Sequence, residues 1–221
     1  MLRADFDRSL SQLQDELLEL GRMVEAAIIK SMDALERRDL TASFEVVQED
    51  ESINRLRFKL EEDSIDLIAT QQPLAVDLRT LVAVLQIAVE LERMGDYAEG
   101  IGKVGLIIGD EPLFKPVEDL HQMSVYALDM LRRSLRAWVD RDTEAAKLVW
   151  EDDDKVDALY GQVCRDLLNG MAREPQTIQR ATHLLWVAHD LERMADRATN
   201  IAERVIFVVT GSMATARKKT Q

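Results

Sequence analysis

Apolar positions recur along the first half of the chain with the period of a helix that is buried on one side. This 3.6-residue period runs over residues 6–35, resumes after "RRDLT" and ends near residue 69. It runs again from the break "TQQP" to residue 108. Asp39 and Thr41, at the first break, are suited to cap a helix. The pattern therefore predicts three long helices in this half.

The second half repeats the first. Helical periods cover residues 116–139, 143–171 and 175–209, with breaks at "RDTE" and "AREP". The segment "ALERRDLTASFEVVQEDESINRL" (34–56) aligns without gaps on "AWVDRDTEAAKLVWEDDDKVDAL" (137–159). Further on, "AVELERMGDYAEGI" (88–101) aligns on "AHDLERMADRATNI" (188–201). The chain therefore consists of two copies of one repeated unit.

Long helices joined by short loops pack as antiparallel bundles. The sequence predicts an all-α protein of two tandem three-helix bundles, over residues 1–110 and 111–221, with "GDEPLFKP" (109–116) joining them. The second unit is expected to end in a short polar tail, "ARKKTQ". Aromatic residues make up only 5% of the chain and Pro numbers four, which argues against a sheet.

Charge and composition exclude several classes of function. A net charge of −13 opposes the phosphate backbone, so no nucleic-acid partner is expected. The start, "MLRADFDRSL", is not a signal peptide, and the longest apolar run, "LVAVLQIAVEL", is too short to cross a bilayer. A cytoplasmic location is expected. The single cysteine, Cys164, cannot form an intrachain disulfide and is interpreted as an inert core thiol.

An acidic stripe interrupts the last helical pattern of each half. At about 100° per residue, side chains four apart share a helix face. Like charges at this spacing destabilise an isolated helix by roughly 0.2–0.5 kcal/mol, so their repetition calls for a compensating cation. The stripe of the first half comprises Glu92, Asp96, Glu99 and Lys103, and that of the second comprises Glu192, Asp196, Asn200 and Glu203.

The preceding helix carries acids at the same heights. Asn54 and Glu92 each lie 19 residues from Pro73, on opposite sides of it. Asp50 and Asp96 each lie 23 residues from that turn. An antiparallel hairpin would therefore set Asp50 and Asn54 across from Glu92 and Asp96. Around Pro175, within one residue, the same count sets Asp153 and Asp157 across from Glu192 and Asp196.

Such a cluster has two interpretations. Carboxylates held close together raise one another's pKa, and a metal ion removes this penalty. Oxygen ligands suit Mg²⁺, Mn²⁺, Ca²⁺ or iron better than a closed zinc site. In the alternative, the acids pair with Arg93, Arg193 or Lys155, or form a solvated face.

No enzyme motif is found. The chain has no Gly-rich phosphate loop, no Glu-x-x-His pair of the ferritin-like kind, and no Ser or Cys nucleophile beside a histidine. Two alternatives to a non-catalytic metal-binding protein stay open. One is a metal-free helical scaffold, and the other is a metal-dependent hydrolase that uses a water held between two ions.

The motifs "QQPLAVDLR" (71–79), "ELERMGDYAEGI" (90–101), "EDDDKVDALY" (151–160) and "LERMADRATNIAE" (191–203) resemble the PhoU family of phosphate-uptake regulators. The resemblance covers nearly the whole chain. It implies tandem three-helix bundles that carry metal ions, with iron or zinc and also magnesium or manganese. It places the family's acidic motif on Glu92/Asp96 and Glu192/Asp196, and its second-helix acids on Asp50 and Asp153/Asp157.

The first unit departs from the family pattern, because "GIGK" stands where the second unit has "NIAE". Gly100 and Lys103 remove two oxygen donors, which Asn200 and Glu203 keep in the second unit. The second site is therefore expected to bind metal better than the first. The full set of candidate metal ligands is Asp50, Glu92, Asp96, Asp153, Asp157, Glu192, Asp196, Asn200 and Glu203.

The resemblance also implies a role and partners. Similar proteins are negative regulators of the phosphate response, without catalytic activity. They link the ATPase subunit of the phosphate ABC transporter to a membrane sensor histidine kinase. Contact with the membrane is then expected only through these partners, and a homodimer is compatible with the family.

Overall fold

The protein is described by a computed structural model that covers residues 2–114 and 117–212. Within these residues all regular secondary structure is helical, which confirms the all-α prediction. The expected start of the fourth helix at Pro116 and the polar tail lie outside the described residues. The elements are α1 (Leu2–Arg37), α2 (Leu40–Gln71), α3 (Val76–Ile108), α4 (Glu118–Asp140), α5 (Thr143–Arg173), the short 3₁₀ helix η1 (Pro175–Thr177) and α6 (Ile178–Thr210).

The tight turns between helices use the same chemistry in both halves. Asp39 caps α2 by accepting a hydrogen bond from the backbone N–H of Ala42 at 3.0 Å, as the sequence predicts. Asp142, its counterpart in the repeat, caps α5 by accepting from Glu144 and Ala145. The residue before each cap, Arg38 or Arg141, takes a positive φ of 56° or 54°. This left-handed residue stops one helix so that the next can turn back.

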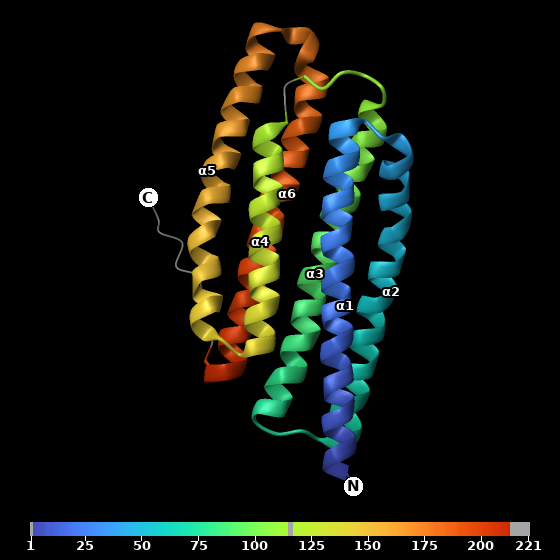
Figure 1. The fold of residues 1–221 in the computed structure, drawn as a ribbon, viewed down its shortest axis with the longest axis vertical. Coiled ribbons are helices and arrows are strands. Elements are labelled where there is room, and N and C mark those ends of the chain that lie inside the picture. Colours follow the sequence, from blue (N-terminus) through green and yellow to red (C-terminus); the bar gives the residue numbers. More distant parts are fainter. Residues whose placement is uncertain (1, 115–116, 213–221) are drawn as a thin grey trace.

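The six helices form two antiparallel bundles that stand side by side (Figure 1). One bundle contains α1, α2 and α3, and the other contains α4, α5 and α6, as predicted. Helices α3 and α6 pack against each other at the centre, and α1 also contacts α4. Buried apolar side chains of all six helices make one continuous core. The last helix of each unit thus serves both its own bundle and the junction between the units.

Two glycines let α2 approach α3 closely. A Cβ atom at Gly95 would lie 3.1 Å from Cγ2 of Ile53, and one at Gly105 would lie 2.6 Å from Oγ of Ser43. Larger side chains at these positions would have to displace their neighbours. The close approach brings the middle of α2 onto the acidic stripe of α3.

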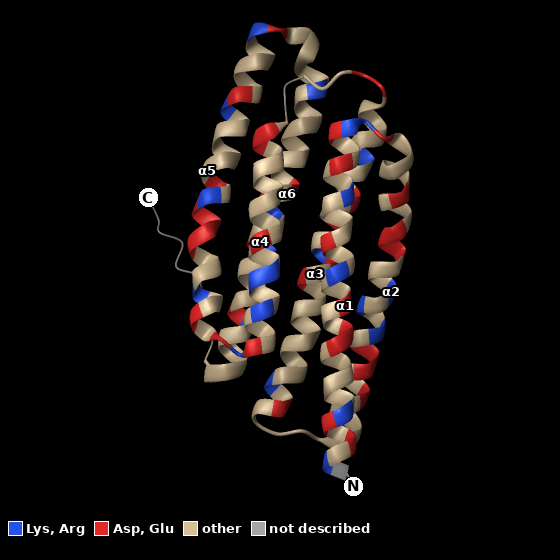
Figure 2. Ribbon diagram, in the orientation of Figure 1, with Lys and Arg blue, Asp and Glu red and all other residues tan. Residues whose placement is uncertain are grey.

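Most charged residues are exposed or half-buried, and acidic residues are frequent along α2 and α5, which lie on opposite sides of the molecule (Figure 2). Within the described part of the chain, no helix is both long and apolar enough to cross a membrane. The prediction that the apolar runs are too short to span a bilayer is confirmed for these residues.

Candidate metal centre

Asp50 is the most deeply buried acid of the first unit's cluster. It lies in the middle of α2 and is only 9% exposed. Its Oδ2 atom accepts a hydrogen bond from Nδ2 of Asn54 at 2.8 Å. Its Oδ1 atom is buried and has no hydrogen-bond partner in residues 2–114 and 117–212. A buried carboxylate oxygen without a partner destabilises the folded state. A hydrogen-bond donor or a cation bound at Oδ1 would remove this penalty.

The acidic stripe of α3 surrounds this carboxyl group. Burial, followed by the negative charges of Asp96, Glu99 and Glu92, raises the pKa of Asp50 to about 6. Burial and the charge of Asp96 raise the pKa of Glu92, and burial and Glu99 raise that of Asp96. The fold therefore brings Asp50 of α2 close to three acids of α3, which together we call the first cluster (Asp50, Glu92, Asp96, Glu99).

Cations near the first cluster only partly balance it. Nζ of Lys103 lies 2.6 Å from Oε2 of Glu99 on the same helix. The charges of Arg57 and Arg93 lower the pKa of Glu92 but do not cancel the effect of burial. Arg57 itself pairs with Glu61 at 2.5 Å. The cluster thus keeps a surplus of negative charge.

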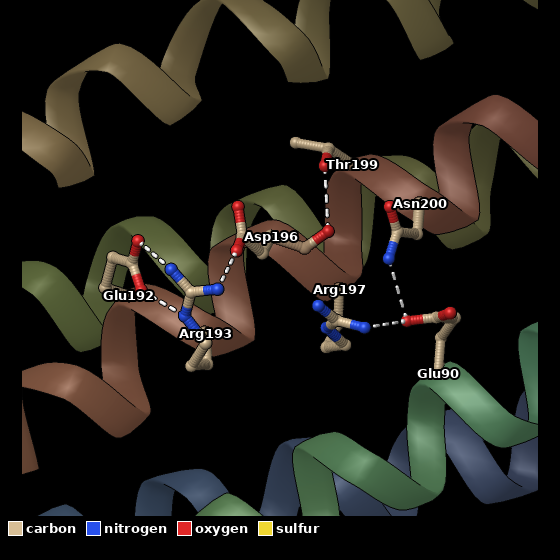
Figure 3. A network of polar contacts seen from close by, with 7 residues as sticks. All are labelled: Glu90, Glu192, Arg193, Asp196, Arg197, Thr199 and Asn200. Carbon is tan, nitrogen blue, oxygen red and sulfur yellow. Dashed lines mark hydrogen bonds and ion pairs between the residues drawn. The ribbon is translucent and has the colours of Figure 1, made fainter. Parts of the chain in front are cut away.

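In the second unit, an arginine of α6 neutralises two acids of the same helix (Figure 3). The guanidinium group of Arg193 lies between Glu192 and Asp196. Its Nη2 atom donates to Oε1 of Glu192 at 2.5 Å, and its Nε atom donates to Oε2 of the same side chain. Its Nη1 atom lies 2.8 Å from Oδ2 of Asp196. Pairing with Arg193, the alternative that the sequence left open, is therefore realised for these two acids.

Asn200 and Glu203 extend the second stripe but make other contacts. Nδ2 of Asn200 donates to Oε2 of Glu90 at 3.0 Å, and Nη1 of Arg197 donates to the same oxygen at 3.1 Å (Figure 3). Because Glu90 belongs to α3, this network joins the two units. Oε2 of Glu203 lies 3.9 Å from Nη2 of its neighbour Arg204.

Two acids of α5, Asp153 and Asp157, complete the predicted set. Asp153 is half-buried and Asp157 is exposed. The phenol group of Tyr160, one turn further along α5, has a pKa raised mainly by burial, then by its hydrogen bond with Cys164, and also by the charge of Glu192. Tyr160 therefore faces the Glu192 side of α6. Lys155, another cation considered from the sequence, pairs with Asp152.

The ligand set is not assembled as a coordination sphere. Within the described ranges, no group of three Asp, Glu, His or Cys side chains is arranged to hold a metal ion. The first cluster nevertheless fits a hard cation by its chemistry, because its donors are oxygens, its charge is in surplus and Oδ1 of Asp50 lacks a partner. Side-chain rotations would have to bring these oxygens together.

Two features of the site were not predicted. Glu99 belongs to the predicted stripe but not to the predicted ligand set, although its charge raises the pKa values of both Asp50 and Asp96. Pairing with Arg193 is one of the alternatives that the sequence leaves open, but the sequence does not predict its bidentate contact with Glu192. The position of Arg193 next to Glu192 was the available signal, but Arg93 stands beside Glu92 in the same way.

Fold and site together define a class: a doubled three-helix bundle that carries acidic clusters between helices. The PhoU domain family matches residues 17–104 and 120–205, one match in each unit. The chain belongs to this family. Its members are accessory regulators of transport rather than enzymes, as the names of the relatives indicate.

Relatives from two bacteria match over almost their whole length. A "Phosphate-specific transport system accessory protein PhoU homolog" of Caulobacter vibrioides is 37% identical over 214 residues, which cover 96% of this chain and 93% of the relative. A homologue of that name in Clostridium acetobutylicum is 35% identical over 212 residues, covering 96% of this chain and 97% of the relative.

Solved structures agree with the fold. The crystal structure of PhoU from Pseudomonas aeruginosa superposes with a TM-score of 0.90 at 28% identity, covering 94% of this chain and all of that one. The phosphate transport system regulatory protein PhoU from Streptococcus pneumoniae gives a TM-score of 0.88 at 30% identity, covering 95% and 99% of the two chains.

Proposed function

We propose that this protein is a metal-binding cytoplasmic regulator of phosphate uptake. The family membership and the names of the relatives, which are accessory proteins of phosphate-specific transport, support a regulatory role in that system. The observation that carries the metal-binding part is the orphaned Oδ1 atom of Asp50 inside a cluster of four acids.

A divalent cation would be held mainly by the first cluster. Mg²⁺ and Mn²⁺ accept carboxylate oxygens together with water molecules, which suits a cluster that runs from the buried Asp50 to the exposed Asp96 at the bundle surface. Iron suits the same oxygens, whereas zinc in a closed structural site prefers Cys and His. When bound, the ion would supply positive charge that neutralises the acids and ties α2 to α3. The surplus of negative charge thus favours the first cluster as the metal site. The comparison of "GIGK" with "NIAE" in the sequence predicts the reverse, a better site in the second unit.

The regulatory action would be that of an adaptor. The protein would contact the ATPase subunit of the phosphate ABC transporter and the sensor histidine kinase of the phosphate response, and would act as a negative regulator of both import and signalling. It would approach the membrane only through these partners, and it could do so as a homodimer. Long rigid helices offer extended faces for such contacts.

The adaptor role is tested by capturing the transporter ATPase and the kinase on immobilised protein. Capture should be strongest with Mn²⁺, should weaken with a chelator, and should lose its metal dependence in Asp50→Asn. The matched control is Asp33→Asn, an exposed acid of α1 away from the cluster, which should keep the dependence. Capture of neither partner under any of these conditions would contradict the adaptor role.

The metal-free scaffold is favoured by one observation in the second unit only. Glu192 and Asp196 already have a cation in Arg193, so these acids are stable without a metal. A melting temperature that neither chelator nor added Mn²⁺ changes would favour this function for the whole protein, because a ligand of the folded state must raise its apparent stability.

A further inference from the structure

The two acid clusters differ in the cation that the chain itself provides. In the second unit the Arg193 guanidinium occupies the space between Glu192 and Asp196, with three contacts (Figure 3). In the first unit the arginine at the same repeat position, Arg93, is exposed. The interaction described for Arg93 is electrostatic: its positive charge lowers the pKa values of Glu92 and Asp96.

We propose that Arg193 is a built-in competitor that occupies the second carboxylate cluster and keeps divalent cations out of it, so that the protein binds metal unequally in its two units. The inference rests on the proposed metal binding at the first cluster. It concerns Arg193 as a residue that sets the selectivity of the second site.

The geometry supports competition rather than coexistence. A bidentate guanidinium uses both oxygens of Glu192, and its third nitrogen uses an oxygen of Asp196. Glu192 is only 8% exposed, so its carboxylate has little room to serve a second cation from the solvent side. A metal ion that takes these oxygens must displace the guanidinium, and the displaced group must regain its hydration at the surface.

Removing the arginine should therefore open the second site. Metal affinity at a carboxylate pair rises when a charge-assisted pair with a competing cation is lost. The side chain of Arg193 is 33% exposed, so its replacement by a polar residue of similar length leaves the core intact. Arg193→Gln is the variant of choice, and Arg193→Lys, which keeps the charge but cannot form the bidentate contact, is a second.

The experiment is a titration with Mn²⁺ alone, in which free Mn²⁺ is followed by its electron paramagnetic resonance signal. The titration is carried out in the Asp50→Asn background, so that only the second cluster is measured. The expected result is that Arg193→Gln tightens Mn²⁺ binding there by about tenfold or more, with Arg193→Lys in between. Arg93→Gln in the same background removes an equal charge from the first unit and should change this binding by less than about twofold.

The outcomes separate two failures. If wild-type protein binds Mn²⁺ through an Asp50-dependent site but Arg193→Gln adds no affinity at the second cluster, the competitor role of Arg193 is wrong and the proposed function stands. If neither wild type nor Arg193→Gln binds Mn²⁺, both are wrong. Unchanged helical circular dichroism in the variants shows that folding is not the cause, and the Arg193→Lys result decides if Arg193→Gln is unfolded.

Discussion

The carboxylate of Asp50 on α2 reaches α3 where Gly95 leaves space for it: a Cβ atom at Gly95 would lie 3.4 Å from Oδ1 of Asp50. The same Cβ atom would lie 3.1 Å from Cγ2 of Ile53. One missing side chain thus lets α2 press against α3 and sets a buried acid beside an acidic stripe. The first cluster depends on this contact as much as on the acids themselves.

Gly95→Leu should separate the two helices and lower stability. Overpacking a close contact of this kind costs about 1–3 kcal/mol, although Leu is the better helix former by about 1 kcal/mol. The matched control is Gly161→Leu on α5, where the nearest neighbour is the flexible end of Arg165, and no loss is expected there. Urea unfolding measures both variants. Equal stability of the two variants would contradict the packing explanation.

Asp50 should make stability depend on pH in metal-free buffer. Its folded pKa of about 6 lies above the ordinary value of 3.8, so the folded state favours the protonated carboxyl. This contribution is fully present below about pH 4, is lost as the pH rises through 6, and is worth at most about 3 kcal/mol. Asp50→Asn should therefore raise the free energy of unfolding at about pH 8 and change it little at about pH 4.

Chemical unfolding of the wild type and of Asp50→Asn between about pH 4 and pH 8, with chelator present, measures how the free energy of unfolding changes with pH. Asp33→Asn on α1 is the control, because that side chain is exposed. A wild type and an Asp50→Asn variant with parallel pH profiles would show that Asp50 is not the group responsible.

Lys103 should weaken cation binding at the first cluster, because its ammonium group lies 2.6 Å from Glu99. An exposed pair of this kind is worth about 0.2–1 kcal/mol, so Lys103→Gln should tighten Mn²⁺ binding by up to about fivefold. Lys147→Gln removes a similar pair on α5, 2.7 Å from Glu144, and should have no effect on the affinity. A larger gain in the Lys147 variant than in the Lys103 variant would reject the local competition.

Glu90 and Asp190 occupy the same repeat position and should respond in opposite ways. Glu90 accepts from Arg197 and Asn200, so Glu90→Gln should lose about 1–2 kcal/mol of stability. Asp190 lies at Gly100 of α3, and burial raises its pKa to about 7, above the ordinary 3.8. Its charge therefore costs stability progressively as the pH rises from about 4 to 7.

Asp190→Asn should accordingly raise the melting temperature at about pH 8 and leave it unchanged at about pH 4. For a chain of this size each kcal/mol corresponds to roughly 2–4 °C. Differential scanning calorimetry of the two variants at both pH values makes the comparison. A loss of stability in Asp190→Asn at about pH 8 would mean that its carboxylate has a favourable partner there.

Most of the fold could be predicted from the sequence. The period of apolar residues, the breaks and the internal repeat gave six helices in two bundles, because each of these signals is local or copied. The packing of α3 on α6 could not be predicted in this way. It depends on which apolar faces of α3 and α6 remain uncovered after each bundle closes, and the apolar period of one helix does not show which of its faces meets the other unit.

The sequence predicts how far along the helices the acids of the site lie, but not in which direction their side chains point. Counting residues from Pro73 places Asp50 beside Asp96, and the pKa of Asp50 responds to that acid. The same count in the second unit gives no hint that Arg193 turns back onto Glu192, because Arg93 has the same spacing and does not. Side-chain direction is set by neighbours on other helices, which one sequence does not show.

The central claim, a cation at the first cluster, is tested most directly by an anomalous difference map from crystals grown with Mn²⁺. The account predicts a peak bounded by Asp50 of α2 and by Glu92, Asp96 or Glu99 of α3, and a weaker peak or none between Glu192 and Asp196. A peak at Glu192 and Asp196 alone, with the Asp50 carboxyl still without a partner, would contradict it.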